Sequence, residues 1–485
     1  MIQYFAKDRR TQFALRRKIM FDKFLESRKA ACKALAEKLQ ESFSYVGILG
    51  SHVLSSAIRV NRKTSSVGEL PESDCGFVIK LNDGGIFYEY SLDDIGEDTD
   101  ALAEKITKEI KLGKSLKCRA VSIEAIPSGS LEKHFERETD TNNYSDAQLL
   151  EFCTGVKDKI LAADKRIINA LCMLRIFEVN KMFVGINRTL TQHYAWINGY
   201  AIAVMRDGDK MVQARETANS HLIKDVIELL PQKIDKLVEK AEHLLSAKPI
   251  TPGVYDVITD PSITGLIAHE AFGHGVEMDQ FVKDRALAKQ FVGKSVASPI
   301  CNMRDGAGSC LSVASYFFDD DGVLAGDTQI IKNGILVGGL CDLTSSAQLK
   351  YAPTGNGRRE SHTHKAYARM TNTFFERGSD KLEDMIASVK HGYMLFETNN
   401  GMEDPKNWAI QCTAEYGIEI VDGKLTENYV SPVVMSGYVP DLLKSIDMIS
   451  DGMEIEGSGM CGKGYKEWVR VSDGGPALKA RVKLG

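Results

Sequence analysis

Two dipeptides in the second half of the chain restrict its fold more than any other local feature. Asn333-Gly334 lies between the runs TQII and ILVGG, and Asp422-Gly423 lies between YGIEIV and KLTENYV. Asn-Gly and Asp-Gly tolerate the left-handed backbone of a tight two-residue turn, and the flanking β-branched and aromatic residues favour strands. Both dipeptides therefore predict β-hairpins, and with them antiparallel sheet.

The first half of the chain joins helix-forming segments to further strands. Apolar residues recur at helical spacing in IMFDKFLESRKAACKALAEKLQESF, and a later helical segment is interrupted at Pro231. Because both halves mix helices with mainly antiparallel strands, the sequence predicts an α+β fold. The expected helices also include 98–113 and 220–247, and the expected strands are 45–60, 74–82, 85–92 and a pair within 181–208.

The segment KPITPG, residues 248–253, is the best candidate for a domain boundary. It carries two prolines and a glycine directly after a long helical pattern, and such a composition is typical of linkers. A chain of 485 residues is also long enough for two domains. We therefore expect an N-terminal α+β domain over 1–247 and a strand-rich C-terminal domain over 248–485.

Composition narrows the class of protein. The net charge of −5 gives no general attraction to nucleic acid or to an anionic membrane, so neither is expected as a partner. The ten cysteines are scattered and form no C-x-x-C pair, which favours reduced thiols over an oxidised secreted scaffold. The chain shows no run of eighteen apolar residues and no secretory signal pattern, so we expect a cytoplasmic protein.

The segment IAHEAFGHG resembles the helical zinc-peptidase motif H-E-x-x-H with one extra residue. An ideal α-helix turns by about 100° per residue, so His269 and His274 would diverge by roughly 140° and could not share one ion. The dipeptide Asp260-Pro261 provides an N-cap and a first-turn proline for this helix. On the same ideal wheel Glu270 and His274 fall on the apolar face, where polar groups cost free energy unless they are bonded or coordinated.

Three interpretations of these residues stay open on spacing alone. Glu270 and His274 can bond each other across one helical turn, with His269 exposed. They can instead both be metal ligands, because they are neighbours at i and i+4. In the third interpretation His269 and His274 are the ligands and Glu270 is a general base, which requires a local change of the helix. Gly273 offers the place for it, since an i→i+5 bulge or early unwinding would absorb the extra residue.

A catalytic zinc ion needs three protein ligands and an open position, so a third donor must come from elsewhere in the chain. Cys461 is the strongest candidate, because glycines surround it in EGSGMCGKGYKE and Lys463 would favour the thiolate. A plain buried thiol is the alternative. His362 and His364 form an H-x-H pair that would face one side of a strand, and they are a second candidate source of the third ligand.

The segment GSGMCGK, residues 457–463, also matches the first part of a phosphate-binding loop, G-x-x-x-x-G-K. The next residue is Gly464 rather than the Ser or Thr that holds Mg²⁺, and no convincing strand precedes the segment. Nucleotide binding is therefore not the favoured interpretation.

Three segments resemble, in order and approximate separation, those of the TldD/PmbA family: HEAFGHGVE, GRRESHTHKAYARMTNTFFERG and GSGMCGK. The resemblance is strong over the C-terminal half and weak over the N-terminal half. It is to the TldD-type subunit, which carries the H-E-x-x-x-H motif. It implies a zinc metallopeptidase with one Zn²⁺ per active subunit, held by His269, His274 and Cys461, and with Glu270 as the catalytic base.

The resemblance also implies how the chain assembles and what it acts on. Family members form dimers that enclose a chamber, so we expect a homodimer or a heterodimer with an inactive PmbA/TldE-type homologue. The expected substrates are unfolded or flexible peptides that are matured or degraded, and a non-catalytic modulator or binding subunit is the alternative. Arg369 and Asn372 are candidates for binding the substrate backbone, or for stabilising a turn. The loop after Cys461 departs from the Gly-Gln-containing loop usual in the family, so substrate preference does not transfer.

Overall fold

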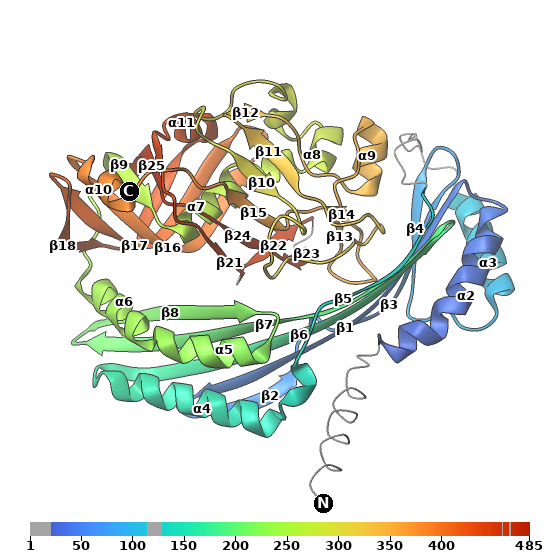
Figure 1. Ribbon diagram of the computed structural model, residues 1–485, viewed down its shortest axis with the longest axis horizontal. Helices are drawn as coiled ribbons and strands as arrows, with labels where there is room; N and C mark the ends of the chain where they lie inside the picture. Colours follow the sequence, from blue (N-terminus) through green and yellow to red (C-terminus); the bar gives the residue numbers. More distant parts are fainter. Residues whose placement is uncertain (1–20, 114–128, 458, 465–466) are drawn as a thin grey trace, which may run out of the picture.

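The computed structural model describes residues 21–113, 129–457, 459–464 and 467–485. A long curved sheet from the first half of the chain supports a second, strand-rich part built from the rest (Figure 1). Helices and mainly antiparallel strands occur in both parts, which confirms the α+β prediction. The predicted boundary, 248–253, runs between the last helix of the first part and the first strand of the second, and the division into domains there stays a prediction.

The curved sheet follows the strand order β4-β3-β1-β6-β7-β5, with β2 paired to β1 and β8 paired to β7. Its described pairings are antiparallel, except for that of β5 with β7. The strand pair predicted within 181–208 is present, but its first strand begins earlier, at Ile167. The strands are β1 (Tyr45–Asn61), β2 (Ser65–Glu69), β3 (Asp74–Asn82), β4 (Phe87–Leu92), β5 (Leu131–Glu136), β6 (Ile167–Gly185), β7 (Arg188–Asp207) and β8 (Lys210–Ser220).

Helices cover the convex side of this sheet and leave its concave side to the second part (Figure 1). In α6 the buried residues Leu237, Ala241 and Leu244 recur at helical spacing and pack in one core with strands β6 to β8. A 3₁₀ turn that contains Pro231 divides the expected helix 220–247 into two, because proline cannot donate the helical hydrogen bond. The helical elements are α2 (Lys23–Gln40), α3 (Thr99–Gly113), η1 (Thr141–Asn143), α4 (Asp146–Ala163), α5 (Ile223–Leu229), η2 (Leu230–Lys233) and α6 (Ile234–Ser246).

The first expected helix, in IMFDKFLESRKAACKALAEKLQESF, corresponds to α2 where it is described, and its first two residues lie outside the described residues. The Asp22 carboxylate caps it by accepting the N–H of Leu25 at 2.9 Å. Buried Leu25, Leu35 and Leu39 then pack with α3 against β1 and β3. The apolar spacing in the sequence therefore gives the correct helix and the correct face.

The second part holds two larger sheets. One has the order β16-β9-β25-β19-β17-β18 and also pairs β16 with β17, so that it closes on itself, while β20 pairs with β25. The other has the order β12-β11-β10-β15-β24-β21, and β13-β14 and β22-β23 form two short hairpins. Its strands are β9 (Gly253–Thr259), β10 (Met303–Asp305), β11 (Thr328–Lys332), β12 (Ile335–Leu336), β13 (Gly357–Arg358), β14 (Tyr367–Ala368), β15 (Asn372–Phe375), β16 (His391–Asp404), β17 (Ala409–Val421), β18 (Lys424–Val430), β19 (Val433–Tyr438), β20 (Met448–Ile449), β21 (Glu454–Glu456), β22 (Met460–Lys463), β23 (Glu467–Arg470), β24 (Ser472–Gly475) and β25 (Leu478–Leu484).

Short helices connect these strands. They are α7 (Pro261–Leu266), η3 (Ile267–Gly273), η4 (His274–Val276), α8 (Met278–Val282), η5 (Leu287–Gln290), α9 (Leu343–Leu349), α10 (Leu382–Ala387) and α11 (Val439–Lys444). The helices α8 to α11 lie on the outside of the two sheets (Figure 1). In contrast, α7 and the turn η3 after it contact strands of both sheets, β16 in one and β24 in the other.

Both predicted hairpins are confirmed. Asn333-Gly334 joins β11 to β12 with φ of 49° and 76°, and Asp422-Gly423 joins β17 to β18 with φ of 46° and 77°. Two successive residues with positive φ define the type I′ turn, whose twist matches that of the flanking strands. These turns set the registers of their strand pairs.

Ion pairs join the concave face of the curved sheet to the second part. Lys80 of β3 is buried and contacts both Asp321 of the second part and Glu89 of β4, the latter at 3.2 Å. Glu89 also contacts Arg359 of the second part at 3.2 Å. Four charges are therefore shared between the two parts, and little water screens them.

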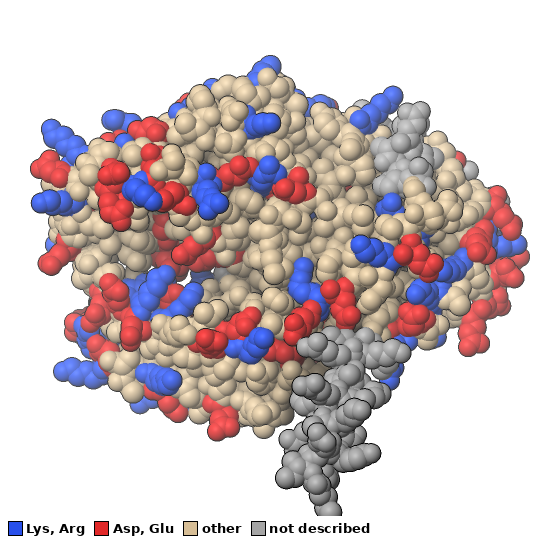
Figure 2. Space-filling model, viewed as in Figure 1, with Lys and Arg blue, Asp and Glu red and all other residues tan. Residues whose placement is uncertain are grey.

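The surface carries charges of both signs. On the face drawn in Figure 2, basic and acidic side chains are interspersed, and a recess separates the two parts at the left of the view. A search of the described residues reveals no helix with the length and apolarity needed to cross a membrane.

Candidate metal site

The helix that carries the histidine motif begins where the sequence predicts. The Asp260 carboxylate accepts a hydrogen bond from the Ile263 N–H at 2.8 Å, and Pro261 occupies the first turn. α-Helical geometry lasts only over α7 and then gives way to the π-helix η3, which spans Ile267–Gly273. Both histidines of the motif therefore lie in or directly after a distorted turn.

This π-helical turn removes the spacing problem of the two histidines. The N–H of His274 bonds the carbonyl of His269, an i→i+5 hydrogen bond in place of the i→i+4 bond of an α-helix. As a result the two imidazoles approach each other, with ring centroids 5.1 Å apart and ring planes at 90°. The sequence predicts such a distortion at Gly273, and the structure extends it to seven residues.

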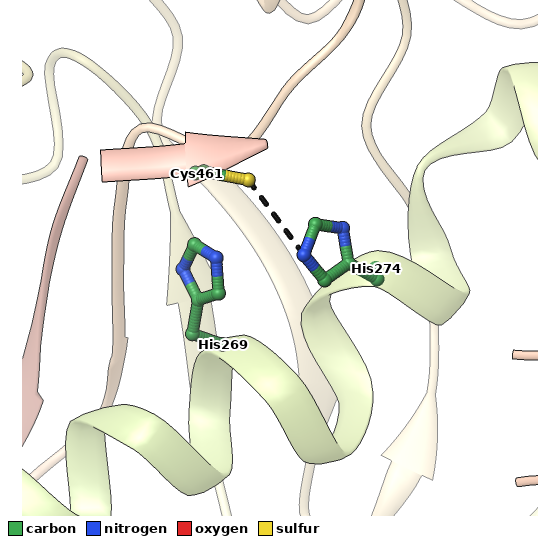
Figure 3. Close-up of side chains that lie close together, drawn as sticks. All are labelled: His269, His274 and Cys461. Carbon is green, nitrogen blue, oxygen red and sulfur yellow. Dashed lines mark hydrogen bonds between the residues drawn. The ribbon is translucent and has the colours of Figure 1, made fainter. Parts of the chain in front are cut away.

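Cys461 joins the two histidines from the β22–β23 hairpin. Its Sγ lies 3.6 Å from Nε2 of His274, and one donor atom from each of Cys461, His274 and His269 lies within 4.8 Å of the others (Figure 3). His269 and Cys461 are buried, and His274 is half-buried. The structure thus brings together the three residues that the sequence singled out as metal donors.

Glu270 lies beside these donors. Its Oε2 is 3.9 Å from Nε2 of His274, which is too far for a hydrogen bond, and His269 is buried rather than exposed. The interpretation as a simple Glu270–His274 bond with an exposed His269 is therefore wrong. Gly401 of β16 leaves room for the Glu270 side chain, because a Cβ there would lie 2.6 Å from Cγ of Glu270. Burial raises the pKa of the Glu270 carboxyl.

The imidazoles and the thiol shift one another's pKa. Burial alone would raise the pKa of Cys461, but His274 and His269 outweigh it and hold the pKa of the thiol well below its usual value. Burial would likewise lower the pKa of His269, whereas the thiolate raises it to about 9. The thiolate, which is the metal-binding form of cysteine, is therefore the favoured state.

Lys463 does not supply the charge that favours this thiolate, contrary to the sequence-based expectation. Its Nζ donates to Glu277 at 2.9 Å, to Asp279 at 2.6 Å and to the carbonyl of Ala368 at 2.8 Å. The amine is therefore fully used within the fold. The two imidazoles act on Cys461 in its place.

Glu277 fixes the orientation of His274. Its Oε2 lies 3.2 Å from Nδ1 of His274. Burial would raise the pKa of Glu277, but Lys463 and His274 outweigh it and hold that pKa far below its usual value. An ionised carboxylate only accepts hydrogen bonds, so Nδ1 of His274 carries a proton and Nε2 is the atom that faces Cys461. Carboxylate–histidine pairs of this kind commonly orient metal-binding imidazoles.

Asp473 of β24 lies behind His269 at a longer distance. Its Oδ2 is 4.0 Å from Nδ1 of His269, and this buried nitrogen has no hydrogen-bond partner among the described residues. Burial raises the pKa of Asp473 to about 6. Because Nδ1 faces Asp473, Nε2 is the ring nitrogen left for the donor set (Figure 3).

Two arginines hold the β22–β23 hairpin, and with it Cys461. Arg369 is fully buried and donates to the carbonyl of Cys461 at 2.6 Å and to that of Glu467 at 3.3 Å. Arg358 donates to the carbonyl of Arg470 at 2.6 Å. Because the hairpin belongs to neither larger sheet, these hydrogen bonds help to fix the position of the thiol.

Asn372, the other candidate for binding substrate, is also used within the fold. It is fully buried, and its amide donates to the carbonyl of Gly306 and to Oγ of Ser315, both at 3.0 Å. The hydrogen bonds of Arg369 and Asn372 therefore support the alternative expectation, that these residues stabilise local backbone.

The H-x-H pair contributes no donor to the site. His362 contacts Asp74 through Nδ1 at 2.7 Å and Asp93 through Nε2 at 3.1 Å, and both carboxylates belong to the first part of the chain. His364 contacts Oγ of Ser361 at 2.7 Å. In the part of the chain that the structure describes, neither histidine belongs to the group of convergent donors. His362 instead joins the two parts of the molecule.

The glycine-rich segment around Cys461 does not have the structure of a phosphate-binding loop. Residues 460–463 form a strand, and 467–470 form its partner strand rather than a helix. The lysine of the motif is already bonded to two carboxylates. Tyr465 and Lys466, where the segment departs from the pattern of the resembling family, lie outside the described residues.

The donor set lines a cleft of about 740 Å³. Its acidic lining consists of Glu270, Glu277, Glu403 and Asp473. Burial raises the pKa of Glu403 to about 8, and its Oε2 accepts the N–H of Gly275 at 3.1 Å. The volume lies in the range typical of small-ligand sites, so the donors are open to a ligand on one side.

These residues fit a catalytic zinc ion. Two imidazoles and a thiolate make three protein donors, and the cleft gives access to a fourth position. Around a tetrahedral zinc ion such donors lie about 3.5 Å apart. The present donors lie within 4.8 Å of one another, so modest side-chain adjustments suffice.

Sequence reasoning missed the carboxylates that surround the donors. Glu277 carries a weak signal, because it follows His274 at the i+3 spacing that allows side-chain contact on a helical turn. Glu403 and Asp473 come from distant strands and have no local pattern. Only the folded chain shows that they face the site.

Comparison by sequence finds metalloprotease relatives. Residues 252–482 match the family described as "PmbA/TldA metallopeptidase C-terminal domain". A metalloprotease TldD homolog of Haemophilus influenzae is 34% identical over 243 residues, 50% of each chain. A zinc metalloprotease TldD homolog of Saccharolobus solfataricus is 30% identical over 288 residues, 59% of this chain and 63% of the relative. The chain thus spans only about half to 63% of the length of these curated relatives.

Comparison by structure finds the same fold at low identity. A Thermotoga maritima MSB8 protein described as a candidate modulator of a DNA gyrase aligns with a TM-score of 0.75 and 18% identity, over 95% of this chain and 100% of the other. TldE from Thermococcus kodakarensis aligns with a TM-score of 0.73 and 18% identity, over 94% and 100%. The match over 252–482 and the relatives named TldD homologs show that this segment is similar to the C-terminal metallopeptidase domain of the TldD/PmbA family, and the structural likenesses show a shared fold.

Proposed function

We propose that the protein is a TldD-type zinc-dependent peptidase that hydrolyses unfolded or flexible peptides. The observation that carries the proposal is the convergence of His269, His274 and Cys461 within 4.8 Å in an open cleft, with the carboxylate of Glu270 beside them. The names of the relatives, metalloprotease and zinc metalloprotease, support it.

In this proposal the three donors hold one Zn²⁺ per subunit. When bound there, zinc supplies Lewis acidity toward a peptide carbonyl and lowers the pKa of water. Glu270 acts as the general base, which takes a proton from the attacking water and returns it to the leaving amine. Among the described residues no hydrogen bond engages the Glu270 carboxylate, so both of its oxygens are available for this transfer.

The size of the cleft supports a preference for unfolded substrates. A peptide bond reaches Glu270 only by entering a space of about 740 Å³, which is far smaller than a folded domain. An extended segment can enter it, whether the reaction matures a peptide or degrades it. We also propose that the protein acts as a homodimer or as a heterodimer with a PmbA/TldE-type homologue, an assembly for which the fold likeness to TldE is the support.

The substitution Glu270→Gln tests the catalytic role. Glutamine keeps the shape of the side chain but cannot accept a proton from water, so we expect bound zinc to be unchanged and hydrolysis of an unfolded peptide to fall by a factor of 10² to 10⁴ or so. Zinc is measured by elemental analysis of the purified protein, and cleavage is measured by release of a quenched fluorophore. Full activity in this variant would show that Glu270 is not the base.

Metal removal separates this function from the alternative of a non-catalytic modulator or binding subunit. A peptidase loses cleavage when a chelator removes the metal and regains it when zinc is returned. A modulator subunit would show no cleavage in either state while it still folds. The likeness to a protein described as a candidate gyrase modulator is the reason to keep that alternative in the test.

A further inference from the structure

The first part of the chain contributes Arg215 to the described lining of the metal cleft. Every other described lining residue lies between Leu266 and Asp473, in the second part. Arg215 lies on β8, opposite Ile202 of β7, and its carbonyl accepts a hydrogen bond from Nζ of Lys240 at 2.6 Å. Its backbone is therefore fixed by the sheet and by a helix, and its side chain reaches the cleft from the opposite part of the molecule.

The guanidinium of Arg215 is unpaired. Among the described residues it donates no hydrogen bond and forms no ion pair, and the side chain is half-buried at the cleft. A guanidinium offers five N–H donors in a planar fork, and these donors are free here. Partial exposure lets water solvate the charge, so the residue needs no protein partner to remain in this position.

Among the described residues, two carboxyl groups interact electrostatically with Arg215, those of Glu397 and Glu415. Glu397 is already bonded to Nζ of Lys240 at 2.8 Å. Burial raises the pKa of Glu415. The acidic neighbours therefore leave the charge of Arg215 available to a ligand.

The remaining charged lining of the cleft is acidic or neutralised. Lys463, the lysine of the described lining, is bonded to Glu277 and Asp279, and His269 and His274 belong to the metal donor set. Among the lysines and arginines of the described lining, Arg215 is thus the single one with free donors, and it shares the cleft with acidic groups such as Glu270 and Glu403. Apart from the proposed metal site, Arg215 is therefore the group in the described lining best placed to bind a negatively charged ligand group.

We propose that Arg215 is a substrate-binding residue that holds a carboxylate of the peptide in the metal cleft. The ligand group is either the C-terminal carboxylate or the side chain of Asp or Glu, since both present the two oxygens that a guanidinium fork engages. This inference rests on the proposed peptidase function and specifies its substrate class: peptides with a carboxylate near the bond that is cut. Arg215 acts on binding and not on the chemistry of hydrolysis.

Peptide binding tests the proposal without requiring catalysis. The protein carries Glu270→Gln, and three fluorescein-labelled eight-residue peptides of Ala, Ser and Gly are compared by fluorescence anisotropy: one with a free C-terminal carboxylate, one with a C-terminal amide, and one amidated with an internal Glu. We expect one or both carboxylate peptides to bind roughly ten- to a hundredfold more tightly than the neutral peptide. The two carboxylate peptides show which source Arg215 recognises.

The variant Arg215→Gln should bind all three peptides equally within about twofold. Arg206→Gln, a change of an exposed arginine on β7, is the matched control and should keep the preference. If Arg215→Gln does not fold, Arg215→Lys is used instead. Lysine keeps the positive charge but lacks the planar pair of N–H donors of the guanidinium, so the preference for the carboxylate peptides should be reduced. A preference that survives these changes, or equal binding by the parent protein, overturns the proposal.

The result of this binding test can be distinguished from the result of the tests of the peptidase function. Metal-dependent cleavage without a carboxylate preference would refute the role of Arg215 and leave the peptidase in place. The protein could instead prefer carboxylate peptides through Arg215 but cleave no peptide with or without zinc. That result would refute the peptidase function and support the role of Arg215 in binding.

Discussion

Two of the three candidate metal donors are held by a charged residue outside the donor set. Glu277 bonds the outer nitrogen of His274 at 3.2 Å, and Arg369 bonds the carbonyl of Cys461 at 2.6 Å. These two partners restrict the orientation of the His274 ring and the position of the Cys461 backbone, so that less entropy would be lost if an ion bound. Single residues outside the donor set are therefore expected to influence how well the proposed site binds metal.

The substitution Cys461→Ala tests the third donor. Loss of a thiolate ligand should weaken zinc binding by more than the 10- to 100-fold that is typical of losing an outer partner, so we expect a factor above about a hundred. Competition with a fluorescent zinc chelator measures the affinity. The matched control is His362→Ala, which removes a histidine that contacts Asp74 instead of the donors and should leave zinc affinity unchanged. Unchanged zinc affinity in Cys461→Ala, together with weaker zinc binding in His362→Ala, would instead assign the third ligand to the H-x-H pair.

At this scale the sequence predicts donors better than their surroundings. His269, Glu270 and His274 lie within one short motif, and the chemistry of that motif is recognisable from residue type and spacing. The surrounding groups depend on which side chains the fold brings near. The sequence places Lys463 close to Cys461, but the lysine contacts Glu277. Residue types alone do not determine such pairings.

Among the elements, the π-helix η3 has the most direct effect on the site. Its i→i+5 hydrogen bond lets two histidines five residues apart approach each other, which an α-helix would prevent. The turn packs tightly, because a Cβ added to Gly273 would lie 2.1 Å from Sδ of Met370 and 3.0 Å from the carbonyl of Ala268. The missing side chain at Gly273 is therefore a condition of this geometry.

The substitution Gly273→Ala should destabilise the protein by about 1 to 3 kcal/mol, the usual cost of overpacking a buried site, and should also weaken zinc binding. Unfolding in urea measures the free energy, and chelator competition measures the affinity. Gly155→Ala, in the helix α4 with open space around it, is the matched control and should not destabilise the protein. The double variant Gly273→Ala with Met370→Ala should recover part of the zinc affinity. If Gly273→Ala loses neither stability nor zinc affinity, the proposed role of the turn is wrong.

Elements were predictable where their cause is local. The two type I′ hairpins, the break at Pro231 and the cap at Asp260 follow from residues adjacent in sequence, and the structure contains all of them. The order of strands in the sheets was not predictable in the same way. Pairs such as β15 with β24 join residues about a hundred positions apart, and their choice depends on the packing of the whole part.

At the scale of the whole molecule, the contact between the two parts shapes both the cleft and its stability. Arg215 lines the cleft from the curved sheet, and Lys80, Glu89, Asp321 and Arg359 join the same sheet to the second part. The sequence predicts two domains from length and composition, but no local pattern indicates which of their faces meet. Charged residues that become partners across the contact are spread over almost three hundred positions.

The shared charges predict how the stability of the molecule depends on pH. Burial would raise the pKa of Glu89, but Lys80 and Arg359 outweigh it and lower the pKa from an ordinary 4.5 to about 2. Because the folded pKa is below the unfolded one, this carboxylate contributes stability that is fully present above about pH 4.5 and is lost as the pH falls toward 2. The shift corresponds to a contribution on the order of 3 kcal/mol at pH 7.

The substitution Glu89→Gln removes this pH-dependent contribution. Glutamine has the same shape and no charge, so the variant should be less stable than the parent at pH 7, and the difference should shrink as the pH falls from about 4.5 toward 2. Urea unfolding at several pH values in this range measures both proteins. Glu132→Gln, which removes the exposed partner of Lys33, is the control and should change stability by less than about 1 kcal/mol at every pH. A Glu89→Gln difference that is independent of pH would mean that Glu89 stabilises the contact between the two parts through its shape and packing instead of its charge.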